Sequence, residues 1–372
     1  MKHSTLFITA LSAMALASCA DADAPLSVHS EDAPADQGIS FRSGMASRAT
    51  ETTNANLTDF YVTAFTGTTP YFTDQKFTKG SDSFFTNPNH YEWLDEKEAI
   101  DFMAYSPSQD ELGADITQES GKANLKLSSF SVPEEIADQV DFITAQASGT
   151  RKDNEATGVE LTFDHRLSQI EVRAKSESTA YTFKVIGVRI GRAQYLGDFD
   201  FASKTWTLDE WHDTAVYTSS CDTITLGSTA QSVMGPSGNA MLLPQTLVPW
   251  GAAGDPDNAA RGAYLGVLLQ ITRNDNGFRV YPFPDYTKTD SNGKVLDYAW
   301  VATPLSGTWE QGKKYIYTLD FTKGGGNTDP DEPIPGIPVL PGDIKFTVQV
   351  NNWIDTPSEV PMTGIEPSYR IH

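Results

Sequence analysis

Strict alternation of apolar and polar side chains is the feature that most constrains this chain. In residues 344–350, IKFTVQV, apolar side chains occupy every second position, and Lys345, Thr347 and Gln349 lie between them. Because successive side chains of a strand point to opposite faces, a period of two indicates a strand with one buried face. Similar runs predict strands over much of the chain, at 59–65, 100–105, 124–130, 159–163, 168–174, 181–190, 263–272, 278–283 and 315–321.

Few segments have the pattern of a helix. Residues 134–140, which follow Pro133, are expected to form a turn or two of helix. The dipeptides Asn276-Gly277 and Asn292-Gly293 are typical of turns between strands. With 39% hydrophobic residues, the chain has enough apolar side chains for a sizeable core. We therefore expect an all-β protein built of antiparallel β-sandwiches.

Two places divide the chain. The stretch 161–174, LTFDHRLSQIEVRA, joins two strands through a polar connection, and we place a boundary there between domains of residues 49–172 and 173–372. Residues 324–342 are mostly Gly, Pro and acidic residues, which predicts a loop. The late strand at 344–353 then pairs within the second domain, the interpretation we favour, or is donated to another molecule.

The first eighteen residues have the composition of a secretory signal peptide. In residues 1–18, basic Lys2 precedes an apolar stretch of about 10–15 residues, which is too short to span a bilayer. The tetrad Leu16-Ala17-Ser18-Cys19 resembles the lipobox of bacterial lipoproteins. That resemblance implies cleavage before Cys19 and attachment of a diacylglycerol to its sulfur, so that acyl chains such as palmitate hold the protein in a membrane. The alternative is an ordinary signal peptide with an incidental cysteine.

The number of cysteines and the net charge limit the chemistry and the partners that we expect for this chain. The chain has two cysteines, and with Cys19 acylated, Cys221 has no intramolecular disulfide partner. We expect Cys221 to be a small buried residue rather than a nucleophile. The formal net charge of −22 argues against nucleic acid as a partner, because phosphates require a basic surface.

Sequence motifs of catalysis are missing. The chain has no Gly-x-Ser-x-Gly elbow, no Gly-x-x-x-x-Gly-Lys phosphate loop and no His-Glu-x-x-His zinc helix. The neighbours Asp164 and His165 make a poor catalytic pair, because adjacent strand side chains point to opposite faces. Loops at 274–277 and 288–299 fail as calcium sites, and the acids at 329–332 are expected to be solvated, with weak calcium binding as the alternative. We predict no catalytic residue, no metal, no cofactor and no enzymatic activity.

Aromatic residues offer one candidate for ligand binding. Of the seven tryptophans, Trp206 and Trp211 flank a turn in the stretch TWTLDEW. A tryptophan ring in such a place can stack on a sugar, and packing in the core or in an interface is the more common alternative. We therefore name Trp206 and Trp211 as candidate stacking residues.

Several longer motifs resemble a known family. They are RATETTNANLTDFYVTAF from Arg48, DFMAYSPS at 101–108, DFITAQASGT leading to GVELTFDHRLSQIEVRA at 158–174, GTWEQGKKYIYTLDF at 307–321 and IKFTVQVNNW at 344–353. In this order and spacing they resemble the fimbrillins, structural or accessory subunits of the type V pili of anaerobic Gram-negative bacteria. The resemblance covers most of the chain after residue 40. It implies two tandem transthyretin-like β-sandwiches and export as a lipoprotein to the outer membrane.

The resemblance also implies a route of assembly. A trypsin-like protease removes the leader, residues 19–48, by cutting after Arg48, with Arg42 as the second choice. Loss of the leader strips a strand, for which segment 26–41 is the candidate, and opens a groove that a strand from a neighbouring subunit fills. The donor is the late strand or, if that strand completes its own domain, segment 359–371.

These observations predict a structural or accessory subunit of a bacterial surface pilus, with a role in adhesion, in the shaft, at the tip or as an anchor. Its partners are other pilus subunits, the outer membrane through lipid on the precursor, and a ligand on a host or bacterial surface. The alternative is a surface lipoprotein that binds carbohydrate and stays tethered through Cys19. A secreted hydrolase is a third class, for which the sequence shows no recognisable site.

Overall fold

The computed structural model describes residues 38–45, 52, 56–82, 84–208, 214–251, 261–286, 288–289, 291–331 and 336–353. Cys19, Arg48, Trp211 and segment 359–371 lie outside the described residues. In the part that is described, strands predominate and the α-helices are one turn long, at α1 (Gln109–Leu112) and α2 (Arg151–Asn154). The prediction of an all-β protein is confirmed, whereas the transthyretin-like arrangement of its sheets stays a prediction.

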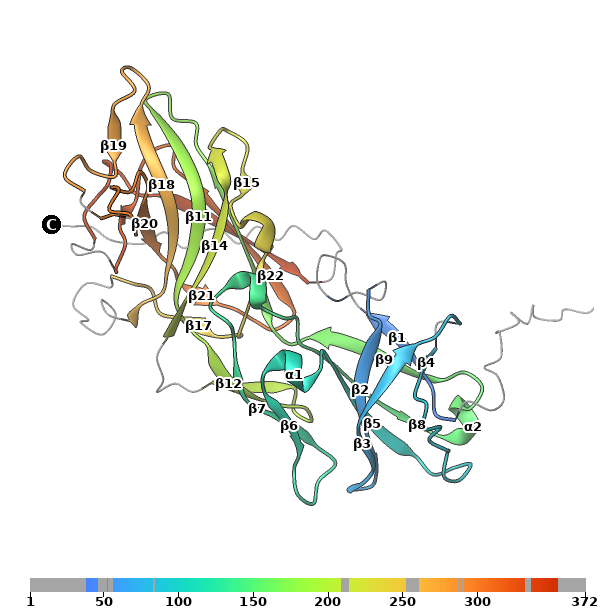
Figure 1. Ribbon diagram of the computed structural model, residues 1–372. Helices are drawn as coiled ribbons and strands as arrows, with labels where there is room; N and C mark the ends of the chain where they lie inside the picture. The colour runs from blue at the N-terminus through green and yellow to red at the C-terminus, as the bar shows by residue number, and fades with distance from the viewer. Residues whose placement is uncertain are drawn as a thin grey trace, which may run out of the picture. The chain divides into compact units, whose positions relative to one another are not determined.

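Strands from the first half of the chain form a closed ring of hydrogen-bonded pairs (Figure 1). Around the ring they follow the order β1 (Phe41–Met45), β4 (Phe85–Thr86), β3 (Thr69–Lys79), β2 (Asp59–Thr66), β5 (Ile100–Ser106), β8 (Ile143–Gly149) and β9 (Val159–His165). We call this ring the barrel. Its interior is filled mainly by aromatic and branched side chains, among them Phe60, Phe77, Phe102 and Phe163.

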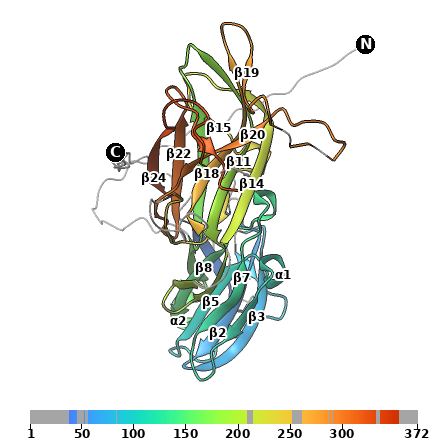
Figure 2. The same cartoon turned by 90° about the vertical axis from the view of Figure 1, so that its left-hand side faces the viewer.

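Two larger sheets follow in the second half of the chain. One has the order β15 (Gln231–Ser232), β10 (Ser168–Lys175), β22 (Lys313–Asp320) and β24 (Lys345–Asn352), with β16 (Ala240–Leu242) also paired to β10. The other has the order β14 (Thr214–Thr225), β11 (Tyr181–Gln194), β18 (Tyr264–Arg273), β20 (Ala299–Pro304) and β23 (Asn327–Thr328), with β19 (Arg279–Tyr281) paired to β18. Figure 2 shows β22 and β24 side by side, to the left of β11 and β18.

The remaining elements are short. A four-stranded sheet has the order β13 (Thr205–Leu208), β12 (Leu196–Asp200), β7 (Leu125–Ser131) and β6 (Asp115–Gln118), and β17 (Thr246–Leu247) pairs with β21 (Gly307–Thr308). The 3-10 helices are η1 (Ile136–Asp138), where the sequence predicts a helical turn, and η2 (Gly235–Ser237). The β12–β13 hairpin lies after the predicted domain boundary near residue 172 and pairs with β7, which lies before it. The boundary therefore stays a prediction, and one sheet crosses it.

The strongly alternating runs are strands, as predicted. In β18, Leu265, Val267, Leu269 and Ile271 are buried in the core. The sequence pattern missed β3, β8 and β14. In β3 the register shifts against β2 interrupt the alternation, and in β14 half of the residues are Thr or Ser. Two ladders among the described strands are parallel rather than antiparallel, β1 with β9 and β10 with β22.

Within the predicted loop at 324–342, the described residues 324–331 make more contacts than the composition suggests. Asp329 was expected to be solvated, but it has no exposed surface, and its Oδ2 lies 3.0 Å from Nη1 of Arg189 on β11. Burial raises the pKa of Asp329 above its usual value, although Arg189 acts in the opposite direction. The expectation was wrong because the loop closes over a strand that carries a basic partner.

Candidate strand-exchange site

Strand β1 comes from the segment that precedes Arg48, and it completes the barrel (Figure 1). It runs parallel to β9, with Phe41 opposite Val159 and Met45 opposite Phe163. On its other side it is antiparallel to β4, with Phe41 opposite Phe85. The barrel is thus closed by residues that belong to the predicted leader.

Side chains at the start of β1 are deeply buried. Phe41 has no exposed surface, and its ring centroid lies 4.8 Å from that of Phe77, 5.0 Å from Phe102 and 6.0 Å from Phe60. Ile39, two residues earlier, has an exposed fraction of 1%. Burial of a large apolar side chain contributes about 1.5–3 kcal/mol, so these two residues hold the end of the predicted leader in the barrel.

The backbone before β1 is fixed by its own contacts. The Ile39 N–H donates to the Tyr91 carbonyl at 2.7 Å, and the Val159 N–H donates to the Ser40 carbonyl at 2.9 Å. Gly38 has φ of +63°, and a Cβ at this position would lie 2.7 Å from the Tyr91 oxygen. A glycine is therefore required where the leader enters the barrel.

The observed strand corrects the position of the predicted one. The sequence predicted a removable strand within residues 26–41, whereas β1 begins at Phe41 and continues to Met45. Residues 26–37 lie outside the described part. The predicted segment and β1 therefore share Phe41, and the turn at Gly38 and the buried Ile39 lie in the predicted segment just before β1.

Arg42, the second choice for proteolysis, lies within β1. Its side chain is exposed, and its guanidinium carbon lies 4.5 Å from the centroid of the Phe84 ring. Its backbone is part of the ladder with β9, opposite Glu160. A protease that binds its substrate in extended form would have to remove β1 from the barrel before it could cut at Arg42, and processing at Arg48 stays a prediction.

A buried polar cluster contacts the chain after the predicted processing site. The Thr52 N–H donates to Oδ2 of Asp141 at 3.0 Å. Nδ1 of His165 lies 3.0 Å from both Asp141 oxygens, and the His165 and Asp141 side chains have exposed fractions of 5% and 7%. Asp164, the sequence neighbour of His165, instead accepts a hydrogen bond from Arg166. The described chain beyond Arg48 is thus tied to the end of β9.

The late strand belongs to the sheet of the same chain. β24 is antiparallel to β22 along its full length, from Lys345 opposite Asp320 to Asn352 opposite Lys313. This outcome confirms the interpretation favoured from the sequence. The next residue, Trp353, is 2% exposed, and its ring is stacked on His165 with centroids 4.2 Å apart and planes at 2°. The polar cluster therefore also fixes the end of β24.

The structure places Trp206 among other aromatic rings. Its ring centroid lies 5.2 Å from that of Phe199 and 5.6 Å from that of Phe130. Its Nε1 donates to the Arg166 carbonyl at 2.6 Å. These contacts favour the packing alternative, and stacking of a ligand on Trp206 or Trp211 stays a prediction.

Cys221 is half-buried, and burial raises the pKa of its thiol. Because the thiolate is the reactive form, we expect Cys221 to react more slowly than free cysteine with a disulfide reagent such as Ellman's reagent at neutral pH. Unfolding in urea should restore the rate of a free thiol. A native rate equal to that of free cysteine would contradict this expectation.

The described part of the chain contains no group of three or more His, Cys, Asp or Glu side chains placed to hold a metal ion. Asp331, from the acidic loop, binds Arg192 at 3.0 Å and accepts a hydrogen bond from the Tyr264 hydroxyl at 2.8 Å. None of the helices described is long and apolar enough to cross a membrane.

Comparisons with known proteins agree with this architecture. The family model described as fimbrillin-like matches residues 47–353. A fimbrial protein from Bacteroides vulgatus has a similar structure, with a TM-score of 0.55 at 15% identity, covering 85% of this chain and 99% of that one. A putative cell adhesion protein from Bacteroides uniformis has a TM-score of 0.47 at 14% identity, covering 86% and 100%. No curated protein sequence matches the chain.

Proposed function

Since the chain belongs to the fimbrillin-like family, we propose that it is a non-enzymatic subunit of a bacterial surface pilus that assembles by strand exchange. The observation that carries this proposal is the position of β1 in the barrel. A strand that lies before a predicted cleavage site, and that is needed to close the barrel, can be removed without breaking the rest of the chain.

Removal of β1 creates a surface that attracts another strand. Without it, the backbone groups of β9 and β4 that face β1 lose their partners, and the rings of Phe60, Phe77 and Phe102 lose the side chain packed on them. An incoming strand with apolar side chains at alternate positions restores both the hydrogen bonds and the apolar contacts. Cleavage after Arg48 starts this exchange by cutting the covalent link between β1 and the mature chain.

We assign the donor role to segment 359–371 of a neighbouring subunit. β24 has the required alternation, but it is paired with β22 and ends at the buried Trp353. Because β24 stays in its own sheet, segment 359–371 is the remaining candidate for the donated strand. Deletion of residues 359–372 is expected to abolish polymerisation and to leave the monomer folded.

The precursor is proposed to reach the outer membrane as a lipoprotein. Acylation of Cys19 holds it there, since two or more acyl chains bind a membrane firmly. In the assembled pilus the lipid is lost together with the leader. The subunit that keeps its leader stays at the membrane, and adhesion is the proposed role of the assembled fibre.

The proposal is tested by competition with the leader strand. A synthetic peptide of residues 38–45, added while the processed subunit polymerises, is expected to occupy the groove and shorten the fibres seen by electron microscopy. The same peptide with Phe41→Asp should have little effect, because a carboxylate cannot be buried among phenylalanine rings. Equal inhibition by both peptides, or by neither, would argue against a groove vacated by β1.

A further inference from the structure

A second site lies on the outer face of the sheet that contains β11, β18 and β20. A cavity of about 430 Å³ opens there, lined by strand residues and by residues of the loop between β19 and β20. On β18, Val267 and Leu269 point into the core, so Leu268 between them points outward into this cavity. The same alternation on β20 places Trp300 on the outer face, directly opposite Leu268 in the ladder.

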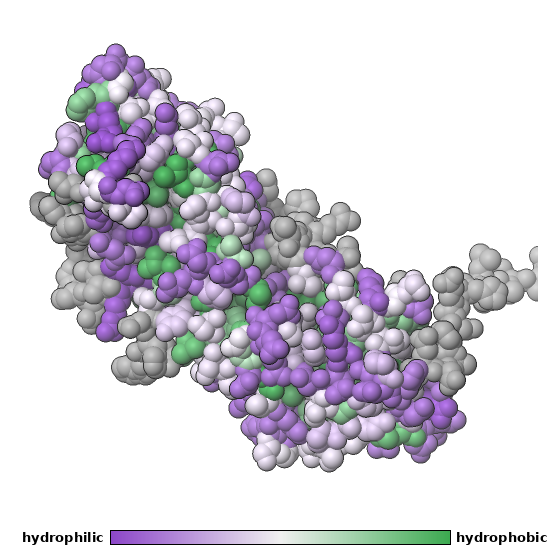
Figure 3. Space-filling view, viewed as in Figure 1, coloured by the Kyte–Doolittle hydropathy of each residue, from purple (hydrophilic) through white to green (hydrophobic). Residues whose placement is uncertain are grey.

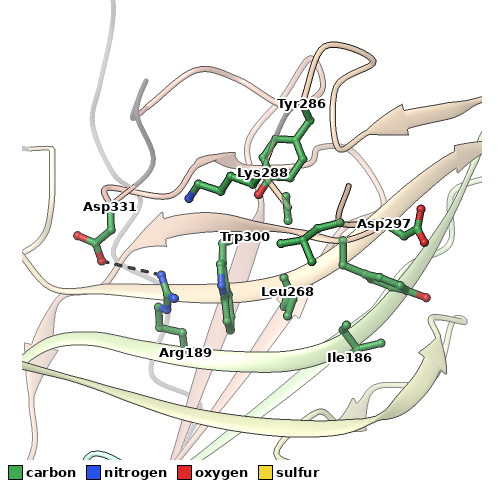
Figure 4. A pocket seen from close by; sticks show the side chains of 11 residues that line it. Ile186, Arg189, Leu268, Tyr286, Lys288, Asp297, Trp300 and Asp331 are labelled. Carbon is green, nitrogen blue, oxygen red and sulfur yellow. Dashed lines mark ion pairs between the residues drawn. The ribbon is translucent and has the colours of Figure 1, made fainter. Parts of the chain in front are cut away.

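The walls of this cavity include aromatic and apolar side chains on a sheet face that points away from the core. Figure 4 shows Trp300 between Arg189 and Leu268, with Tyr286 and Lys288 on the opposite side of the cavity. The Arg189 guanidinium lies 4.1 Å from the centroid of the Trp300 ring, which fixes the orientation of the ring. The solvated face of an antiparallel sheet is normally polar, so a half-buried tryptophan here suggests a ligand.

Charged groups around the cavity are largely neutralised by one another. Arg189 pairs with Asp329 at 3.0 Å and lies 3.8 Å from Asp331. Asp297 lies 3.3 Å from Arg279 and 3.1 Å from Lys294. These pairs offer hydrogen bonds but little net charge, and the formal net charge of −22 for the chain opposes the approach of an anion.

From the aromatic lining and the mutually paired charges we propose that the cavity binds a neutral hexopyranose unit of a glycan. One apolar face of the sugar stacks on the aromatic wall, and its hydroxyl groups exchange hydrogen bonds with Lys288, Asp297 and the tyrosine hydroxyls. Small-ligand cavities are commonly about 300–1,000 Å³, so this volume suits one or two sugar rings. Glycan binding at this cavity would be a further property of the proposed pilus subunit, and it does not depend on strand exchange.

The loop between β19 and β20 does not expose the large hydrophobic surface that a protein partner needs. In the described part, the large hydrophobic side chains left exposed include Leu296 at 36% and Val295 at 41%. On the face drawn in Figure 3, hydrophobic side chains lie in small groups between hydrophilic ones. A small polyhydroxylated ligand fits such a surface better than a protein does.

Saturation-transfer difference NMR on the purified monomeric chain tests the proposal. The probes are the methyl glycosides of glucose, mannose, galactose and fucose, and those of N-acetylglucosamine and N-acetylgalactosamine. At least one neutral glycoside is expected to bind saturably. Trp300→Ala should weaken its binding about tenfold, while Trp300→Phe, which keeps an aromatic face, should retain most of it.

A second variant keeps the test valid if Trp300→Ala fails to fold. Leu296→Arg places a long side chain at an exposed position of the cavity wall and should reduce binding without affecting folding. Val248→Arg is the matched control, because Val248 is 53% exposed and does not line the cavity. The proposal is overturned if no neutral glycoside binds, or if binding persists unchanged in both cavity variants.

Discussion

Replacement of Phe41 by alanine is expected to lower the free energy of unfolding of the unprocessed chain by about 3–5 kcal/mol, the usual cost of deleting a buried phenylalanine ring. Phe41 has no exposed surface and contacts several other phenylalanine rings in the barrel. The cavity left behind is enclosed by strands whose pairing restricts their movement. Urea denaturation followed by tryptophan fluorescence measures the loss.

Arg42→Ala is the matched control for this variant, since it lies in the same strand with an exposed side chain. It is expected to lower the free energy of unfolding by no more than about 1 kcal/mol, because the exposed contact of Arg42 with the Phe84 ring is weak. In a chain that starts at Ala49, neither residue is present, and the barrel should bind a hydrophobic dye that the unprocessed chain does not bind. A loss of less than 1 kcal/mol for Phe41→Ala, roughly the mean effect of a point mutation, would mean that β1 is not firmly held.

Replacement of Trp353 by alanine is expected to cost about 3–5 kcal/mol as well. Its side chain is 2% exposed, stacks on His165 and belongs to the main core cluster. Loss of the ring also leaves the buried His165–Asp141 pair without the aromatic surface packed on it. Urea denaturation measures the effect in the processed chain.

Asn352→Ala provides the comparison for Trp353→Ala, because Asn352 is exposed at the end of the same strand. Its effect should stay within about 0.5 kcal/mol. If Trp353→Ala were equally mild, β24 would not be anchored at its end. β24 would then become the better candidate for the donated strand, and the assignment of segment 359–371 would be wrong.

Strands with one buried face were predictable because the alternation of apolar and polar residues within each strand indicates which side chains are buried. In β24, Phe346, Val348 and Val350 are more buried than the residues between them, as the alternation indicates. β1 was harder to predict, because it is short and its partner β9 lies far along the chain. Ile39 and Phe41 give an apolar alternation around Ser40, but nothing local specifies a parallel ladder with Val159.

Polar contacts between distant residues could not be predicted from the sequence. Asp141 and His165 are 24 positions apart and meet because β8 and β9 pair next to them. Arg189 and Asp329 are 140 positions apart, so no local pattern identifies their ion pair. The surroundings of Trp206 could not be predicted either, because the stretch TWTLDEW is compatible with an exposed ring and with a ring packed on Phe199.

The mass of the N-terminal peptide of the polymerised protein, taken from the cell surface, tests the central claim most directly. The account predicts a chain that begins at Ala49 and carries no lipid, since β1 must leave before a neighbouring strand can enter the barrel. A polymerised chain that begins at acylated Cys19 and retains residues 38–45 would contradict the account. In that case the barrel would stay closed by its own leader, and the subunits would have to associate through another surface.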